Sequence, residues 1–209
     1  MQIESIKNII FDLGNVIINI DPELSVKAMS QLGFSDFNQS YSLLNQSHLF
    51  DSLEKGLINP EQFHKEINSQ LKVEVSNKTI DMAWGAMLLD FPKARIELLQ
   101  KLSKKYRLFL LSNTNIIHYH QYNNDLIDMF GFDLNSLFEK AYYSFEVGMR
   151  KPDVEIFEYV LNESNLNPFE TVFIDDLDKN IDVAGRMGFN TIWIDVAKGD
   201  DITEKLNNF

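Results

Sequence analysis

Residues 8–17 read NIIFDLGNVI, and this stretch decides the fold. The run Ile9–Phe11 has the composition of a buried strand, and Asp12 follows it directly, just before a glycine turn. In an open α/β sheet, ligands bind at the carboxyl ends of the strands, which is where Asp12 would lie. A carboxylate beside so apolar a run is costly unless a cation or hydrogen-bond donors neutralise it. Asp12 is therefore either a plain cap or turn residue, or the centre of a functional site.

The composition is that of an ordinary soluble globular protein. Of the 209 residues, 44% are hydrophobic and 24% are charged. The formal net charge of −12 argues against nonspecific binding to nucleic acid or to an anionic membrane, because both require a basic surface. The sequence has no cysteine, no apolar run of the roughly 20 residues that span a bilayer, and no secretory pattern at its start. We therefore expect a cytoplasmic protein with no nucleic-acid or membrane partner, and nothing in the pattern implies a protein partner.

Residues 21–90 show helical patterns and no convincing strand. Asp21-Pro22 and Asn59-Pro60 each combine a preferred N-cap residue with a proline at the first helical position. Gly33 is expected to end the first of these helices, and a further helix is expected over about Lys78–Leu88. This part of the chain is therefore predicted to be entirely helical.

After residue 91, helices and strands alternate. Strands are predicted over 107–111, 141–144, 171–174 and 191–194, with helices over 92–105, from 116, over 153–161 and over 178–187. Such alternation indicates βαβ units and a parallel sheet. The predicted fold class is α/β: a Rossmann-like core of residues 1–20 and 91–209, with a helical cap of residues 21–90 inserted after the first strand. An insertion at that point would lie over the carboxyl edge of the sheet.

Polar residues follow the predicted strands. Asp12 follows the first strand, Ser112-Asn113 the second and Asp175-Asp176 a third, while Lys151 lies in the segment 148–153. The carboxyl ends of parallel strands meet at one edge, so these side chains are expected to converge. Taken singly, Ser112-Asn113 could be a helix cap and Lys151 could lie in a plain turn. Two adjacent acids at a strand end are harder to dismiss, because they repel each other without a cation.

Together these residues form a set suited to phosphoryl transfer. Asp12 and Asp176 can share a hard cation such as Mg²⁺, which prefers a few carboxylates and keeps several waters. Ser112 and the N–H of Asn113, expected at the start of a helix, suit an anionic oxygen. Lys151 adds a positive charge beside the phosphate. A metal, amide donors and a cation around the transferred group are the recurring parts of phosphoryl-transfer sites.

The same segments resemble the motifs of the haloacid dehalogenase-like (HAD) hydrolase superfamily, and the resemblance covers nearly the whole chain. The matching segments, in order, are FDLGNV (11–16), LLSNT (110–114), GMRKP (148–152) and FIDD (173–176) with Asn180. The helical insertion after the first motif is similar to the small cap of that family. Within the superfamily, the residues of the first two motifs look most like those of bacterial sugar-phosphate phosphatases, including the α-D-glucose-1-phosphate phosphatases.

The resemblance implies a role for each matching residue. Asp12 would attack phosphorus and become an aspartyl-phosphate, which water then hydrolyses. Mg²⁺ would be held by Asp12, the backbone carbonyl of Gly14 and Asp176. Ser112, Asn113 and Lys151 would bind the phosphoryl oxygens, and Lys151 would also orient Asp12. Asp175 would support the site residues through a hydrogen bond or contact the metal indirectly, and Asn180 would lie in the same outer layer of the site.

One departure from the family pattern concerns Gly14. Most phosphatases of the family carry a second aspartate at this position, which acts as general acid and base and is usually worth roughly 100- to 10,000-fold in rate. Three explanations are open: a substrate with a good leaving group, such as a sugar C1 phosphate; another acid, with Asp21, Glu54 or a cap histidine as candidates; or weak activity. Gly14 also keeps two rival functions open, a metal-free haloacid dehalogenase and a non-catalytic phosphate-binding protein.

The cap is expected to select the substrate. The candidates for side chains that face the site are Phe50, Glu54, Gly56 and Trp84. The sequence has four histidines, and none of them has a metal-ligand partner at helical spacing in the segments of the predicted active site. His118 and His120 lie two residues apart in a predicted helix and should point to different faces, so both are interpreted as surface residues; His48 and His64 belong to the predicted cap.

Overall fold

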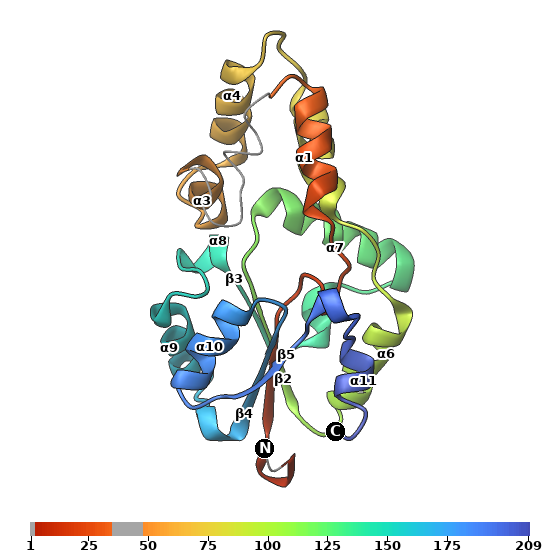
Figure 1. The fold of residues 1–209 in the computed structure, drawn as a ribbon, viewed down its shortest axis with the longest axis vertical. Coiled ribbons are helices and arrows are strands. Elements are labelled where there is room, and N and C mark those ends of the chain that lie inside the picture. Colours follow the sequence, from red (N-terminus) through yellow and green to blue (C-terminus); the bar gives the residue numbers. More distant parts are fainter. Residues whose placement is uncertain (1–2, 35–47) are drawn as a thin grey trace.

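The computed structural model describes residues 3–34 and 48–209. Its centre is a parallel sheet of five strands in the order β3-β2-β1-β4-β5 (Figure 1). Phe11, the last residue of the central strand, is in register with Leu110 on one side and Ile174 on the other, so these three strands end within two residues of one another. The predicted α/β class with a parallel sheet is confirmed. The strand bounds are β1 Asn8–Phe11, β2 Arg107–Ser112, β3 Lys140–Tyr143, β4 Thr171–Asp175 and β5 Asn190–Trp193.

Helices cover both faces of the sheet, which explains why the strands are apolar on both sides. Ile9 and Phe11 pack against α6 (Lys93–Leu102), α7 (Ile116–Phe130) and α11 (Ile202–Lys205). Ile10, from the opposite side of the same strand, packs against α9 (Val154–Glu163) and α10 (Asp178–Arg186). Short elements complete this part: η1 Ile3–Ser5, η3 Leu134–Leu137, α8 Ser144–Val147, η4 Pro168–Glu170 and η5 Val196–Lys198.

The helices between β1 and α6 lie beyond the carboxyl ends of the strands (Figure 1) and pack around a separate apolar cluster, to which α7 contributes Ile117. Both predicted helix starts are confirmed: Asp21 accepts a hydrogen bond from the N–H of Glu23, and Asn59 forms a reciprocal capping box with Gln62. The predicted helix 78–88 ends early, at Trp84, and continues as a 3-10 turn. The bounds are α1 Pro22–Gln31, α3 His48–Glu54, α4 Pro60–Gln70, α5 Asn77–Trp84 and η2 Gly85–Met87.

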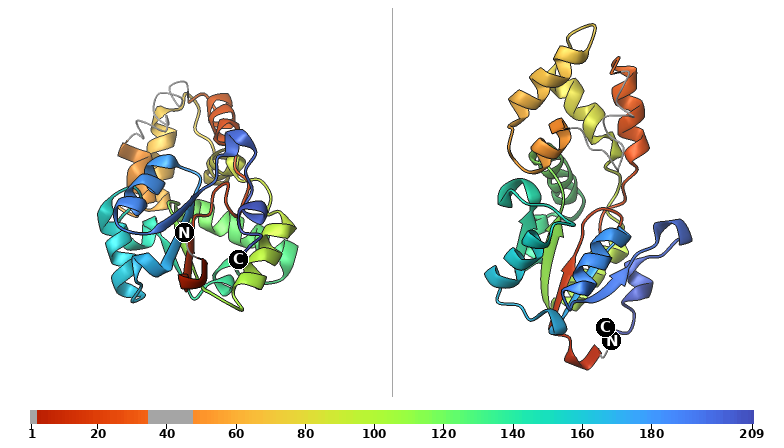
Figure 2. Two further views of the ribbon diagram at one scale, coloured as in Figure 1. Left: turned by 60° about the horizontal axis from the view of Figure 1, so that its bottom comes forward. Right: turned by 60° about the vertical axis from the view of Figure 1, so that its left-hand side comes forward.

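Two chain segments connect these helices to the sheet, and they are hydrogen-bonded to each other. The N–H of Asn19 donates to Asp90 O at 2.9 Å, and the N–H of Leu89 donates to Asn19 O at 3.0 Å. Away from these segments, α3 contacts α8 at the rim of the sheet, as the views in Figures 1 and 2 show. The division of the chain at residues 20 and 91 remains a prediction. None of the described helices is long and apolar enough to cross a bilayer.

Gly56, just after α3, packs closely against the backbone of Phe145 in α8. Its φ is +64°, and a Cβ there would lie 2.1 Å from the backbone oxygen of Phe145. Gly131 also has a positive φ, of +82°, but a Cβ there would meet nothing within 4 Å. An alanine at Gly56 would therefore cause both backbone strain and a clash, whereas an alanine at Gly131 would cause backbone strain alone.

We expect Gly56→Ala to lower the free energy of unfolding by about 2–4 kcal/mol, because it adds a backbone clash to the cost of a left-handed residue, which is about 1 kcal/mol. Gly131→Ala should lose only about 1 kcal/mol. Equilibrium urea denaturation of both variants tests this. Equal losses in the two variants would contradict the packing described for α3.

Candidate active site

A buried lysine lies between two carboxylates at the carboxyl edge of the sheet. Lys151 is 1% exposed, and its Nζ is 2.6 Å from Asp12 Oδ1 and 2.6 Å from Asp175 Oδ2. Asp12 follows β1, and its N–H donates to Ile174 O in β4, so the sheet itself fixes its backbone. Three segments that are distant in sequence thus meet in one ion-paired group. The predicted convergence of these side chains occurs.

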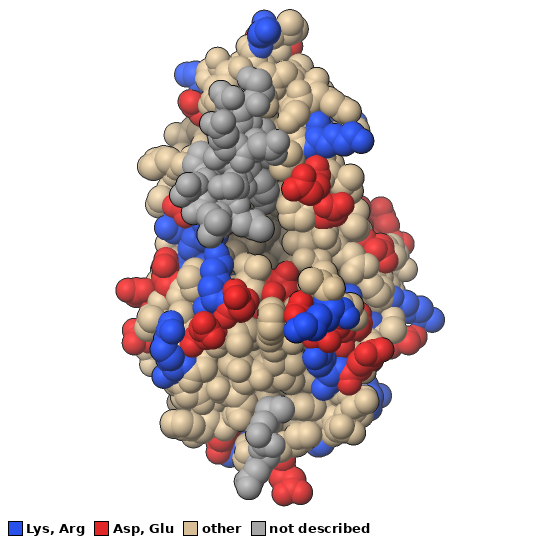
Figure 3. Space-filling model, in the orientation of Figure 1, with Lys and Arg blue, Asp and Glu red and all other residues tan. Residues whose placement is uncertain are grey.

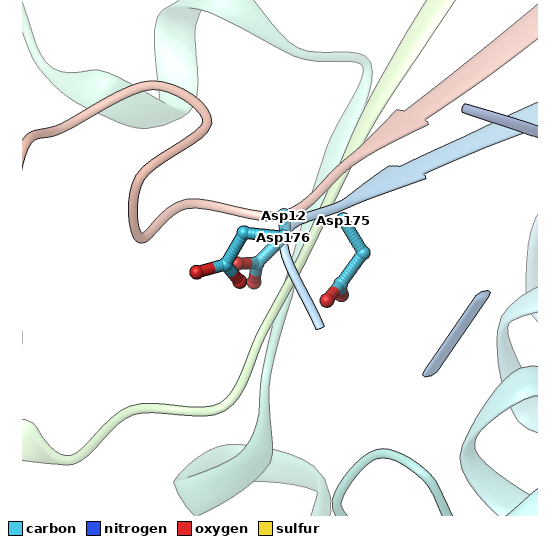
Figure 4. A group of neighbouring side chains, drawn as sticks. All are labelled: Asp12, Asp175 and Asp176. Atoms are coloured by element: carbon cyan, nitrogen blue, oxygen red, sulfur yellow. The ribbon is translucent and has the colours of Figure 1, made fainter. Parts of the chain in front are cut away.

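Asp175 is held by donors on both of its oxygens. Oδ2 accepts from Lys151, and Oδ1 accepts from the N–H of Leu177 at 2.9 Å and from Asn180 Nδ2 at 2.8 Å. The Asp175 carboxylate is therefore directed at the lysine, and Figure 4 shows it apart from the Asp12 and Asp176 carboxylates, which lie side by side. Of the two adjacent acids, Asp175 thus has a cationic partner in Lys151, whereas no described cation is paired with Asp176. Asp175 contacts Lys151 directly, and Asn180 contacts Asp175, so both are in position to orient the lysine.

Asp176 points back toward the turn after β1. Its Oδ2 accepts a hydrogen bond from Asn15 Nδ2 at 3.0 Å, and Asn15 Oδ1 accepts from the N–H of Ile20 at 3.2 Å. Asn15 has a φ of +57°, a left-handed conformation that asparagine tolerates better than most residues. Sequence reasoning assigned Asn15 no role, although it stands in the first motif. Its side chain ties the turn after Asp12 to Asp176.

The charges of this group are not balanced. One oxygen each of Asp12, Asp175 and Asp176 can be chosen so that all three lie within 4.8 Å of one another (Figure 4), whereas Lys151 is the one cation paired with them in the described part of the chain. Burial raises the pKa of Asp12 to about 7 despite the nearby lysine, and burial also raises the pKa of Asp176. Burial lowers the pKa of Lys151, but the charges of Asp12 and Asp175 outweigh this and leave that pKa raised. A divalent cation would balance the remaining charge.

The residues expected to bind phosphate lie beside this group. Asp12, Gly14, Asn113, Lys151 and Asp176 line one cavity of about 320 Å³. Ser112, at the end of β2, lines an adjoining cavity together with Gly14 and Asn113.

Asn113 and Lys151 are joined through reciprocal hydrogen bonds of the asparagine side chain with the backbone N–H and C=O of Lys151, at 2.9 and 2.8 Å. Asn115 caps α7, accepting from the N–H groups of Ile117 and His118, so Ser112-Asn113 is not the helix cap.

The candidate substitutes for a second aspartate divide clearly by position. Glu54 lines both cavities and pairs with Arg150 Nη2 at 3.2 Å. Asp21 caps α1, and His64 pairs with Asp81 at 2.6 Å. His48 lies 3.2 Å from the hydroxyl of Ser52 and lines neither cavity, so the structure places neither cap histidine at the site.

Other expectations for the helical part are met only in part. Trp84 lines the smaller cavity, whereas Phe50 packs in the apolar cluster and Gly56 packs on Phe145. The interpretation of His118 as a surface residue is wrong: it is 6% exposed and stacks on Trp84. His120 is exposed, as expected. Helical spacing shows that the two histidines face different ways, but not that one of those faces is covered by Trp84.

The charged side chains on the surface are mixed in sign. On the face drawn in Figure 3, lysine and arginine side chains alternate with aspartate and glutamate side chains and form no continuous basic area. The net charge of −12 is therefore not offset on this face by a basic surface.

Comparison with known proteins agrees with the four motifs. The model of the haloacid dehalogenase-like hydrolase family matches residues 6–188. The chain belongs to this family. Among curated relatives of this HAD-like hydrolase is the D-ribitol-5-phosphate phosphatase of Bacteroides thetaiotaomicron, 32% identical over 89% of this chain and 90% of the relative.

Solved structures support the same assignment. A HAD family enzyme from Bacteroides thetaiotaomicron, an aspartate-to-alanine mutant in complex with magnesium and inorganic phosphate, aligns with a TM-score of 0.86 and 38% identity, covering 90% of this chain and 93% of that chain. A predicted HAD-like family hydrolase from Porphyromonas gingivalis aligns with a TM-score of 0.84 and 32% identity over 90% and 91% of the two chains. The predicted family and fold are both confirmed.

The buried lysine should matter for stability. Lys151→Met, which keeps the length of the side chain, would leave Asp12 and Asp175 buried without their cation, and we expect it to lower the free energy of unfolding at pH 8 by about 3–5 kcal/mol. Asp12→Asn keeps the pair of Lys151 with Asp175 and should lose less than half as much. Urea denaturation without divalent cations measures both. A Lys151→Met protein as stable as the wild type would contradict the ion-paired geometry.

Proposed function

We propose that the protein is a Mg²⁺-dependent phosphatase of small phosphomonoesters, sugar phosphates among them, which works through an aspartyl-phosphate at Asp12. The observation that carries the proposal is the position of Asp12, Lys151 and Asp176 together on the wall of one cavity. Two comparisons support the proposal. The curated Bacteroides relative is named a phosphatase, and the similar solved structure from Bacteroides contains magnesium and inorganic phosphate.

The residues present fit a magnesium ion. Both oxygens of Asp175 are occupied by donors, so the carboxylates available for a metal are those of Asp12 and Asp176, and the backbone carbonyl of Gly14 is the third proposed ligand. These are hard oxygen donors, too few to enclose the ion, which suits a metal that keeps several waters. When bound, Mg²⁺ supplies positive charge that offsets the charge of the phosphoryl oxygens.

The proposed reaction uses Asp12 as the nucleophile. A carboxylate oxygen of Asp12 forms a bond to phosphorus while the ester P–O bond breaks, and the leaving alcohol oxygen takes up a proton. Water then attacks phosphorus, the bond to Asp12 breaks, and phosphate and the free carboxylate are released. Lys151 favours the ionised form of Asp12, which burial opposes, and Ser112 and Asn113 would hold the phosphoryl oxygens.

Protonation of the leaving group needs a residue other than Gly14. A Cβ at Gly14 would lie 2.9 Å from Ile20 Cδ1, so a side chain there would have to displace that isoleucine. Among Asp21, Glu54 and the two histidines of the cap, Glu54 is the one that lines the cavity with Gly14. The geometry therefore favours Glu54, or a substrate whose leaving group needs little protonation.

The remaining assignments are proposals of the same kind. We assign residues 21–90 to a cap that covers the site and residues 1–20 and 91–209 to the core. A small phosphate ester is the proposed partner, without nucleic acid, membrane or a second protein. The lack of cysteine suits a reducing compartment, and we propose the cytoplasm.

The nucleophile can be tested by an isosteric change. Asp12→Asn removes the attacking oxygen, and we expect phosphate release from a panel of phosphate esters with Mg²⁺ to fall by at least a thousandfold while the circular dichroism spectrum is unchanged. Asp182→Asn, an exposed change on α10, should keep wild-type activity. Retained turnover in Asp12→Asn would remove Asp12 from the mechanism.

Two results with the wild type would favour a rival function. Halide release that EDTA does not stop would favour the dehalogenase, and phosphate binding without turnover would favour a binding protein.

Metal binding can be tested without turnover. Mg²⁺ at a hundred times its Kd should stabilise the wild type by about 2.7 kcal/mol, because only the folded chain forms the site. Asp176→Asn should lose most of the resulting rise in Tm, and Asp182→Asn should keep it. Differential scanning fluorimetry with a Mg²⁺ titration measures both. An undiminished rise in Asp176→Asn would place the metal elsewhere.

A further inference from the structure

A second, smaller cavity adjoins the proposed phosphate site. It has a volume of about 110 Å³, and it shares Gly14, Ser112 and Asn113 with the surroundings of that site. Its other walls mix apolar side chains with Glu54, Trp84 and His118. A group attached to a phosphate held by Ser112 and Asn113 would therefore enter a space that is partly apolar and partly lined by polar atoms. No step proposed so far uses His118.

His118 is held in one orientation. It stacks on Trp84 with ring centroids 4.7 Å apart and an interplanar angle of 25°, and its Nε2 lies 3.1 Å from the backbone oxygen of Trp84. That oxygen can only accept, so Nε2 carries the hydrogen. The same oxygen also accepts from the hydroxyl of Ser25, which fixes its position. The ring is thus locked between α7 and the end of α5.

The other ring nitrogen is a free acceptor. Burial lowers the pKa of His118 to about 4, so the ring is neutral near pH 7 and Nδ1 keeps its lone pair. Among residues 3–34 and 48–209, Nδ1 has no hydrogen-bond partner. It is also not completely buried, so a ligand or water can reach it. His118 is 6% exposed and lines the smaller cavity, and Nδ1 is the polar ring atom that it can offer there.

We propose that His118 determines specificity by accepting, at Nδ1, a hydrogen bond from a hydroxyl of the leaving group. The inference rests on the proposed phosphatase function and narrows its substrates to hydroxylated esters, such as sugar or polyol phosphates. The Trp84 ring on the same cavity offers an apolar face to the carbon chain. An ester without hydroxyls would leave Nδ1 of His118 unsatisfied, which is how buried polar sites reject such analogues.

The geometry also separates this role from proton transfer. With its hydrogen on Nε2, directed at a carbonyl, His118 has no proton to give to the leaving oxygen near pH 7. Its removal should therefore change which esters are hydrolysed, and leave the chemical step intact for esters that have no hydroxyl.

The test compares two esters of equal chain length, a polyol phosphate of three to five carbons and the corresponding alkyl phosphate. We expect His118→Phe to lower kcat/KM for the polyol phosphate by about ten- to a hundredfold, the loss of one buried hydrogen bond, and to change kcat/KM for the alkyl phosphate by less than about threefold. His120→Phe, an exposed change two residues further along the same helix, should alter neither value. Equal losses on both esters would show a merely structural role, and no loss on either would show that Nδ1 is unused; both outcomes overturn the proposal.

A second measurement needs neither turnover nor a stable His118→Phe protein. In the Asp12→Asn protein with Mg²⁺ and ¹⁵N-labelled histidine, the Nδ1 resonance of His118 should move upfield with the polyol phosphate and stay in place with the alkyl phosphate. An unmoved resonance at saturation with the polyol phosphate overturns the proposal. If the wild type hydrolyses neither these two esters nor any other ester of the panel, the phosphatase function fails, and the resonance still decides whether His118 binds the hydroxyl.

Discussion

The ion-paired group around Lys151 is the interaction on which the rest of the site depends. A fully buried ammonium is costly, and here it is stabilised by two carboxylates at 2.6 Å that come from the ends of neighbouring strands. Asn113 holds the backbone of the same lysine from the end of β2. The lysine therefore joins the ends of three strands, and it does so at the residue proposed to attack phosphorus.

The segment that carries Lys151 also contacts the helices above the sheet. Arg150, its neighbour in sequence, pairs with Asp51 at 3.0 Å and with Glu54 at 3.2 Å, both on α3. Lys151 thus lies in the site, and Arg150, the residue before it, reaches α3. Because Glu54 and Gly14 line the same two cavities, this contact holds the carboxylate that we propose as the proton donor on the wall of the site.

Much of the fold and part of the site could be predicted from sequence because the signals are local. The apolar run ending at Asp12 indicates a buried strand, and Asp21-Pro22 indicates a helix start, whatever surrounds them. The contributions of Asn15 and His118 could not be predicted, because each depends on a partner distant in sequence: Asp176 for the one and the backbone of Trp84 for the other. Periodicity shows which face of a helix a side chain occupies, and not what covers that face.

The central claim is that Asp12 carries the phosphoryl group beside a metal held with Asp176. A crystal structure of the protein grown with Mg²⁺ and beryllium fluoride, which mimics a phosphoryl group on a carboxylate, tests it most directly. The account predicts beryllium fluoride bonded to an oxygen of Asp12, within hydrogen-bonding reach of Ser112, Asn113 and Lys151, with Mg²⁺ between it and Asp176. Beryllium fluoride on another residue, or a metal without contact to Asp12 and Asp176, would contradict it.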